Sequence, residues 1–112
     1  MMVLHIDFEV APEQESAFEA AYRDRYVPAL RVQTGYLRSK LTKVFAPALV
    51  AEIDAAPTPY NYQMELVFDT EANRRRWVAS PEHAVVWPLA SGLARAVRWR
   101  GYDVVGEDRM GG

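Results

Sequence analysis

Two histidines are the side chains best suited to proton transfer in this chain. They are His5 and His83, and the chain contains no cysteine. A neutral imidazole can take a proton from an acidic phenol near pH 7, so both are candidate catalytic bases. Each also has a structural alternative: His83 would stabilise the start of a helix, and His5 would form hydrogen bonds in a sheet. The lack of cysteine excludes disulfides, thiolate catalysis and Cys-ligated metals.

Aromatic side chains near the predicted helices are candidates for binding a flat ligand. We expect a substrate pocket between the sheet and the helices, formed by Trp77, Trp87, Tyr62 and Tyr22 beside His83. Packing in the core or at an interface is the simpler role for each of them.

Metal binding is not expected. The chain has no H-x-H, H-x-x-x-H or E-x-x-H spacing, which are common arrangements of metal ligands. We also expect no organic cofactor.

Charged side chains at alternate strand positions could bind an anion or an enolate. We favour instead that they pair with one another across the sheet. The basic residues are Arg38, Lys40, Arg98 and Arg100, and the acidic ones are Asp7, Glu9 and Glu65.

Hydrophobic periodicity predicts the elements that hold these residues. Apolar residues alternate over 2–10 and 60–68, and less regularly over 36–45 and 97–105, which predicts four strands. In the second strand, Leu37, Leu41 and Phe45 would line one side. Gly101 indicates a possible bulge in the last strand.

Proline and cap residues predict the helices. A first helix begins at Pro12, is kinked or restarted by Pro28, and ends near Gly35. A second is capped by Asp69 or Thr70 and reaches Trp77, and a third begins at Ser80. Residues 46–59 are predicted to be a loop with one helical turn near 50–55.

The element order predicts a single α+β domain over residues 1–112. It is strand, helix, strand, strand, helix, strand, and right-handed crossovers give a ferredoxin-like βαββαβ fold with a four-stranded antiparallel sheet. Both helices then cover one face. The other face is polar, and it is either exposed to water or packed on a second sheet. The surplus of large aromatics favours a homodimer.

Three segments resemble a known family. They read YQMELVFD over 62–69, RRWVASPEH over 75–83 and RGYDVV over 100–105. With Pro28 and the Gly35-Tyr36 turn, they resemble the antibiotic biosynthesis monooxygenase family of dimeric α+β barrels over roughly residues 2–105. The resemblance implies a dimer with two sheets face to face, and in each protomer a cavity between sheet and helices.

The resemblance also implies chemistry. Some members oxygenate polycyclic phenols without metal or flavin. One branch degrades haem with a His seven residues after the Ser of W-x-x-S, but Trp87 stands at that distance from Ser80, so we expect no haem.

The sequence therefore predicts a cofactor-independent monooxygenase-like protein that acts on an aromatic or quinone-type small molecule. The alternative is a non-enzymatic dimeric ligand-binding or scaffold protein. A formal net charge of -2 argues against a nucleic-acid partner. No apolar run is long enough for a membrane span, and the N-terminus does not resemble a signal peptide, so we expect a cytoplasmic protein.

Overall fold

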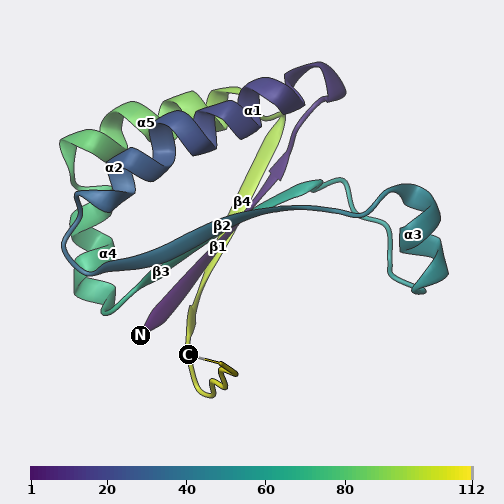
Figure 1. The fold of residues 1–112 in the computed structure, drawn as a ribbon. Coiled ribbons are helices and arrows are strands. Elements are labelled where there is room, and N and C mark those ends of the chain that lie inside the picture. The colour runs from purple at the N-terminus through teal and green to yellow at the C-terminus, as the bar shows by residue number, and fades with distance from the viewer. Residues whose placement is uncertain (112) are drawn as a thin grey trace.

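Four strands form one antiparallel sheet in the computed structural model, which describes residues 1–111. The strand order is β2-β3-β1-β4. The strands are β1 (Met2–Glu9), β2 (Tyr36–Lys43), β3 (Tyr62–Phe68) and β4 (Ala96–Asp103). Most of the helices lie over one face of this sheet (Figure 1). The predicted ferredoxin-like α+β arrangement is therefore confirmed.

Seven short helical elements connect the strands. They are the 3₁₀ turn η1 (Pro12–Gln14), α1 (Glu15–Ala21), the π turn η2 (Tyr22–Tyr26), α2 (Val27–Arg31), α3 (Pro47–Glu52), α4 (Glu71–Val78) and α5 (Pro81–Gly92). The helix predicted from Pro12 corresponds to the run from η1 to α2.

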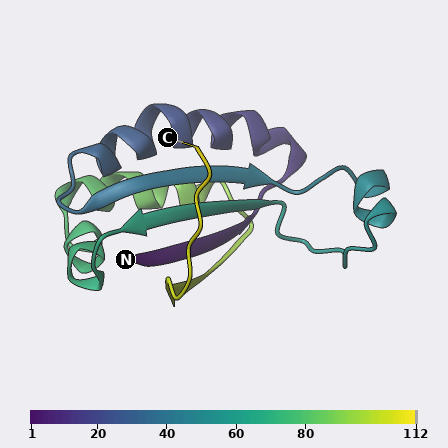
Figure 2. The same ribbon diagram turned by 60° about the horizontal axis from the view of Figure 1, so that its bottom comes forward.

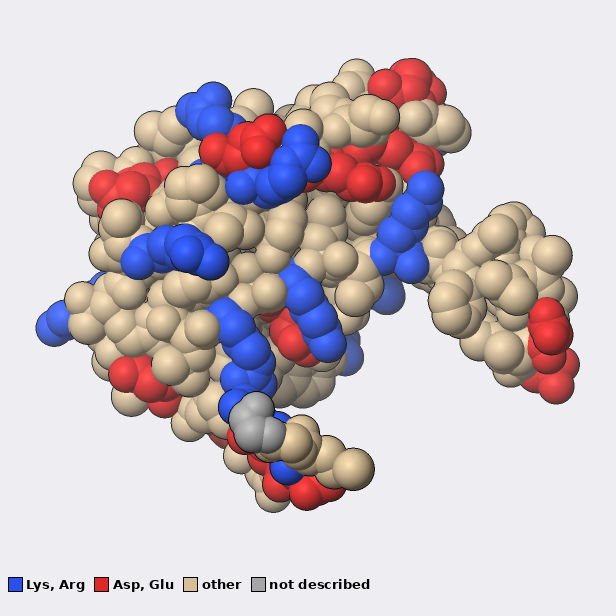
Figure 3. Space-filling model, in the orientation of Figure 1, with Lys and Arg blue, Asp and Glu red and all other residues tan. Residues whose placement is uncertain are grey.

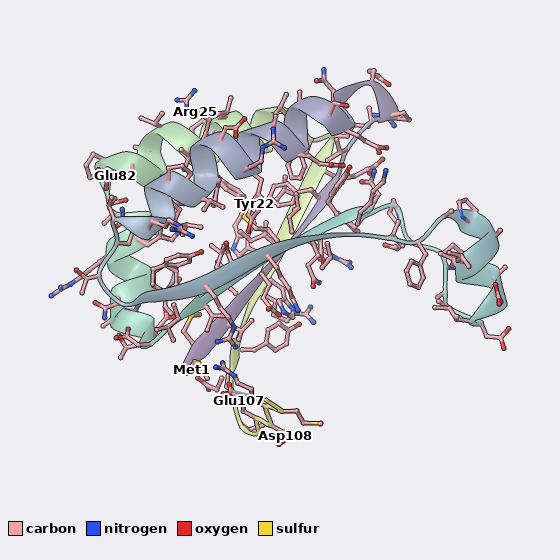
Figure 4. The ribbon with its side chains drawn as sticks, viewed as in Figure 1. Met1, Tyr22, Arg25, Glu82, Glu107 and Asp108 are labelled. Atoms are coloured by element: carbon pink, nitrogen blue, oxygen red, sulfur yellow. The ribbon has the colours of Figure 1, made fainter. Side chains whose placement is uncertain are left out.

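The first helical run changes its winding just before Pro28. Proline has no backbone N–H, so Pro28 cannot donate the usual helical bond to residue 24. The chain widens into the π turn η2, in which the Val27 N–H donates to the Tyr22 carbonyl. The predicted irregularity is confirmed and takes the form of a π turn. Arg25, which lies in this turn, points away from the sheet (Figure 4).

Helices α4 and α5 begin at predicted caps and are joined by Ala79 and Ser80. Thr70 Oγ1 accepts from the Asn73 N–H at 3.1 Å, and Ser80 Oγ accepts from the His83 N–H at 3.1 Å. Ser80 Oγ also donates to the Trp77 carbonyl at 2.7 Å. Because Ser80 bonds both helices, it fixes Trp77 relative to His83.

Alternate strand residues fill the core between sheet and helices. Phe8 and Leu66 from the sheet are fully buried, as are Leu30 and, at 1 % exposure, Trp77 from the helices. Each such side chain contributes about 1.5–3 kcal/mol through burial. This packing holds α4 and α5 against β1 and β3.

Strand β2 departs from the predicted alternation. Its pairing with β3 shifts between Tyr36 and Arg38, which is a bulge. As a result Ser39 hydrogen-bonds the hydroxyls of Tyr22 at 2.7 Å and Tyr36 at 2.8 Å, while Leu37 is half exposed. The prediction that Leu37 lines the core side was wrong.

Two further sequence predictions need correction. Phe45 lies beyond the end of β2 and is 56 % exposed, so it is not part of the core. Gly101 pairs with Leu4 in regular register, so the bulge predicted there is absent and the irregularity of the sheet lies in β2.

The segment between β2 and β3 projects from the sheet as an arm carrying α3 (Figure 1). Its helical turn begins at Pro47, three residues before the predicted one. The arm exposes Phe45, Leu49 and Ile53. Figure 3 shows a mostly uncharged arm surface with acidic side chains at its outer end.

Candidate active site

A cavity of about 210 Å³ lies between the sheet and the helices, beside the junction of α4 and α5. Leu4, Ile6 and Val78 give it aliphatic walls. The three tryptophans of the chain, Trp77, Trp87 and Trp99, also line it. The cavity therefore has an apolar, largely aromatic lining that suits an apolar molecule.

The aromatic walls hold His83 between two indoles. The rings of His83 and Trp77 meet edge to face, with centroids 5.0 Å apart. On the other side His83 stacks on Trp87 at 6.1 Å with an interplanar angle of 13°. Trp87 in turn meets Trp99 edge to face at 5.9 Å. These contacts fix the plane of the imidazole at the cavity wall.

His83 is available as a proton acceptor. Its backbone N–H is bonded to Ser80, and its ring nitrogens have no hydrogen-bond partner within residues 1–111. Burial lowers the pKa of the imidazole below its usual value of 6.5, because desolvation disfavours the charged form. The ring is therefore neutral at pH 7, as a general base requires.

Two further polar side chains border the cavity. Tyr26 comes from the π turn, is 1 % exposed, and meets Trp77 edge to face at 5.7 Å. Arg74 comes from α4, where its Nε donates to Glu71 at 3.1 Å. No carboxylate is among the residues that line the cavity.

Tyr26, Arg74 and Trp99 also line the cavity, although none of them was predicted from the sequence as a site residue. The signal for Tyr26 was its place midway between Tyr22 and Leu30, four residues from each on one helical face. The signal for Trp99 was its alternation with the charged residues of β4, which places it on the helix side.

The structure brings three of the predicted site residues together, namely His83, Trp77 and Trp87. It does not bring His5 to them. His5 alternates with Leu4 and Ile6 along β1, so it points to the opposite face of the sheet. There its Nε2 hydrogen-bonds Glu65 Oε1 at 3.0 Å.

Tyr62 and Tyr22 lie on the helix side but outside the cavity. The Tyr62 hydroxyl donates to Glu19 and, at 3.4 Å, to Glu15, and burial together with these carboxylates raises its pKa. The Tyr22 side chain points from the helix toward β2 (Figure 4). Both hydroxyls are already bonded within the protein, so neither is free for a ligand in this cavity.

Within residues 1–111, no three His, Cys, Asp or Glu side chains lie close enough to hold a metal ion. In the same range no helix has the length and apolar character needed to cross a membrane.

Sequence comparison and structural comparison give different results. No family model matches the sequence, and no curated protein matches it. The fold is similar to that of SnoaB, a cofactor-independent oxygenase from Streptomyces nogalater. SnoaB is 15% identical, with a TM-score of 0.73 over 95% of this chain and 94% of that one.

Other solved structures also have a similar fold at low sequence identity. A candidate antibiotic biosynthesis monooxygenase from Deinococcus radiodurans has a TM-score of 0.74 at 12% identity, with all of both chains covered. An ethyl tert-butyl ether d family protein from Bacillus halodurans has a TM-score of 0.67 at 19% identity, over 94% of this chain and 100% of that one.

This chain shares the fold of these solved structures. The fold expected from the resemblance of residues 62–69, 75–83 and 100–105 is thereby confirmed. A likeness at such low identity shows the fold alone, because one fold can support many activities.

Proposed function

We propose that this protein binds an aromatic or quinone-type small molecule in the cavity and oxygenates it with molecular oxygen, without a cofactor. The observation that carries the proposal is the position of His83, a neutral base held between Trp77 and Trp87 at the wall of an apolar cavity. SnoaB, which has the same fold, is a cofactor-independent oxygenase.

The first step is proton transfer to His83. A substrate with an acidic CH₂ between aromatic rings, as in an anthrone, loses one proton from that carbon to the imidazole and becomes a carbanion delocalised onto its carbonyl oxygen. The indoles of Trp77 and Trp87 hold the flat ring system beside the base.

The second step is the reaction of the substrate anion with oxygen. The anion gives one electron to O₂, the two radicals combine into a C–O bond, and the peroxide takes up a proton. Loss of the second hydrogen of the carbon and cleavage of the O–O bond leave a carbonyl and release water. The balance is CH₂ plus O₂ giving C=O plus H₂O, so the substrate itself supplies the electrons.

The test is oxygen uptake with anthrone- and quinol-type compounds, followed by mass analysis of the product made under isotopically heavy oxygen gas. We expect one labelled oxygen in the product. His83→Ala should lower turnover by about 10²–10⁴-fold, the usual contribution of a general base, while ligand binding changes little.

A different result would favour the alternative of a non-enzymatic ligand-binding protein. If compounds bind but oxygen uptake stays at the rate in buffer, the cavity binds without catalysing. If His83→Ala keeps full turnover, the base has been assigned to the wrong residue.

We also propose a homodimer formed through the face of the sheet that the helices leave uncovered, here called the open face. In Figure 2 this face is toward the viewer, and the C-terminal segment crosses it. Tyr102 is 44 % exposed on it beside His5, with ring centroids 5.0 Å apart. Amphipathic aromatics of this kind are favoured at interfaces.

A further inference from the structure

The hydroxyl of Tyr26 has no hydrogen-bond partner. Among residues 1–111 it is the only buried side-chain oxygen or nitrogen without one. Buried tyrosine hydroxyls normally find a partner, because an unmade hydrogen bond in the interior destabilises the fold. The other tyrosines between helices and sheet follow that rule, since Tyr22 bonds Ser39 and Tyr62 bonds Glu19.

The backbone around Tyr26 is unusual as well. Tyr26 is the last residue of the π turn η2, directly before α2 and Pro28. Single π turns within helices are rare and are frequent at functional sites. This turn places Tyr26 on the buried side, against Trp77, while Arg25 points outward (Figure 4).

The polar groups around the cavity that Tyr26 borders are mainly hydrogen-bond donors. The other polar side chains in its lining are Arg74, which can only donate hydrogen bonds, and His83, which can do either. With no carboxylate in the lining and the positive charge of Arg74 at its edge, the wall has no group that neutralises a cationic ligand. An oxygen that accepts hydrogen bonds fits this set best.

We propose that the Tyr26 hydroxyl donates a hydrogen bond to an oxygen of the ligand, and so selects aryl ketones and phenols over hydrocarbons. This rests on the proposed function in that it takes the same cavity as the ligand site. The volume of about 210 Å³ takes up one or two rings of a fused system, because a cavity of about 150 Å³ takes up benzene. A three-ring ligand such as an anthrone would extend beyond it.

The same bond would assist the proposed reaction. When the substrate loses its proton, negative charge develops on its carbonyl oxygen, and a hydrogen bond to a charged acceptor is stronger than one to a neutral acceptor. Burial raises the pKa of the Tyr26 hydroxyl, so it keeps its proton and remains a donor at neutral pH.

The test is Tyr26→Phe, which removes the hydroxyl and keeps the ring that packs on Trp77. The probes are 2-naphthol and naphthalene, which share a ring system and differ in one oxygen. Binding is followed by tryptophan fluorescence, which reports on this site because all three tryptophans line it. We expect naphthol to bind about tenfold more weakly to the variant, the loss of one hydrogen bond, and naphthalene to bind equally well.

Stability gives a second, independent readout. Without ligand, Tyr26→Phe should raise the melting temperature, because it removes an unpaired buried hydroxyl. The matched control is Tyr22→Phe, which loses the bond to Ser39. The control should lower the melting temperature and leave the naphthol-to-naphthalene affinity ratio unchanged.

An unchanged affinity ratio in Tyr26→Phe would overturn the inference, and so would a failure of the wild-type protein to bind either probe. The outcome is separate from that of the proposed reaction, since no oxygen uptake is measured. Selective naphthol binding through Tyr26 in a protein that consumes no oxygen would refute the reaction and leave the inference standing.

Discussion

The two faces of the sheet differ in whether their polar side chains have bonding partners. On the open face charged side chains form pairs, as where Asp7 accepts from Arg98 and from Gln63, each at 3.0 Å. Around the cavity on the helix face, the ring nitrogens of His83 and the hydroxyl of Tyr26 have no partner within residues 1–111. Unpaired groups beside an apolar cavity are suited to a ligand, and paired ones to water or a second sheet.

The two histidines show the contrast most directly. His5 bonds Glu65, which also lies 3.6 Å from the Nζ of Lys40. His83 is surrounded by indole rings and has a lowered pKa. The same residue type is thus tied into a charge network on one face and free to accept a proton on the other.

The largest expected difference between the faces is in stability. Trp77→Ala, on the helix face, should lower the free energy of unfolding by about 3–5 kcal/mol, because it empties a buried site. Arg98→Ala, on the open face, should cost less than about 1 kcal/mol, since its pair with Asp7 is exposed within one protomer. Urea unfolding of both variants measures this. A loss for Arg98→Ala as large as that for Trp77→Ala would contradict this comparison.

Catalysis should separate the faces next. His83→Ala should lower turnover strongly, as stated above. His5→Ala should change turnover by less than about threefold, because His5 lies on the opposite side of the sheet from the cavity. Oxygen uptake measures both variants. A comparable loss in the two would mean that the open face takes part in the reaction.

Dimerisation should depend on the open face and not on the helix face. We expect the protein to be a dimer in sedimentation at micromolar concentration. Tyr102→Asp on the open face should weaken the dimer by about tenfold or more, because it places a charge in the interface. Val85→Asp is the matched control, since Val85 is exposed on α5 over the other face. A monomeric wild-type protein would rule out the dimer.

The smallest effect is the dependence of stability on pH. Because the pKa of His83 is lowered in the folded protein, the unfolded chain binds the proton first as the pH falls. The contribution of His83 is therefore complete above about pH 6.5 and is lost as the pH drops from there through the folded pKa.

Urea midpoints at pH 7.5 and 5.5 check this pH effect. The wild type should lose more stability than His83→Gln between these values. Identical losses in the two proteins would mean that His83 is as well solvated in the folded state as in the unfolded chain.

The local pattern of the sequence determined much of this fold. Alternation in residues 2–10 and 60–68 placed the side chains of β1 and β3 on the correct faces. The face of each side chain follows from the period of two along a strand. The caps at Thr70 and Ser80 were readable because a cap acts within three residues. Together they put Trp77, His83 and Trp87 near one helix junction.

Tertiary structure alone decided how the site is completed. The bulge in β2 placed Ser39 under Tyr22, and the π turn before Pro28 brought Tyr26 to the cavity. Both depend on which packing the whole core favours, so no short window of sequence specifies them. The place of His5 is different, because alternation along β1 already put it on the polar face, away from the predicted pocket. The sequence supplied two candidate bases, and the fold placed one of them, His83, beside the tryptophans.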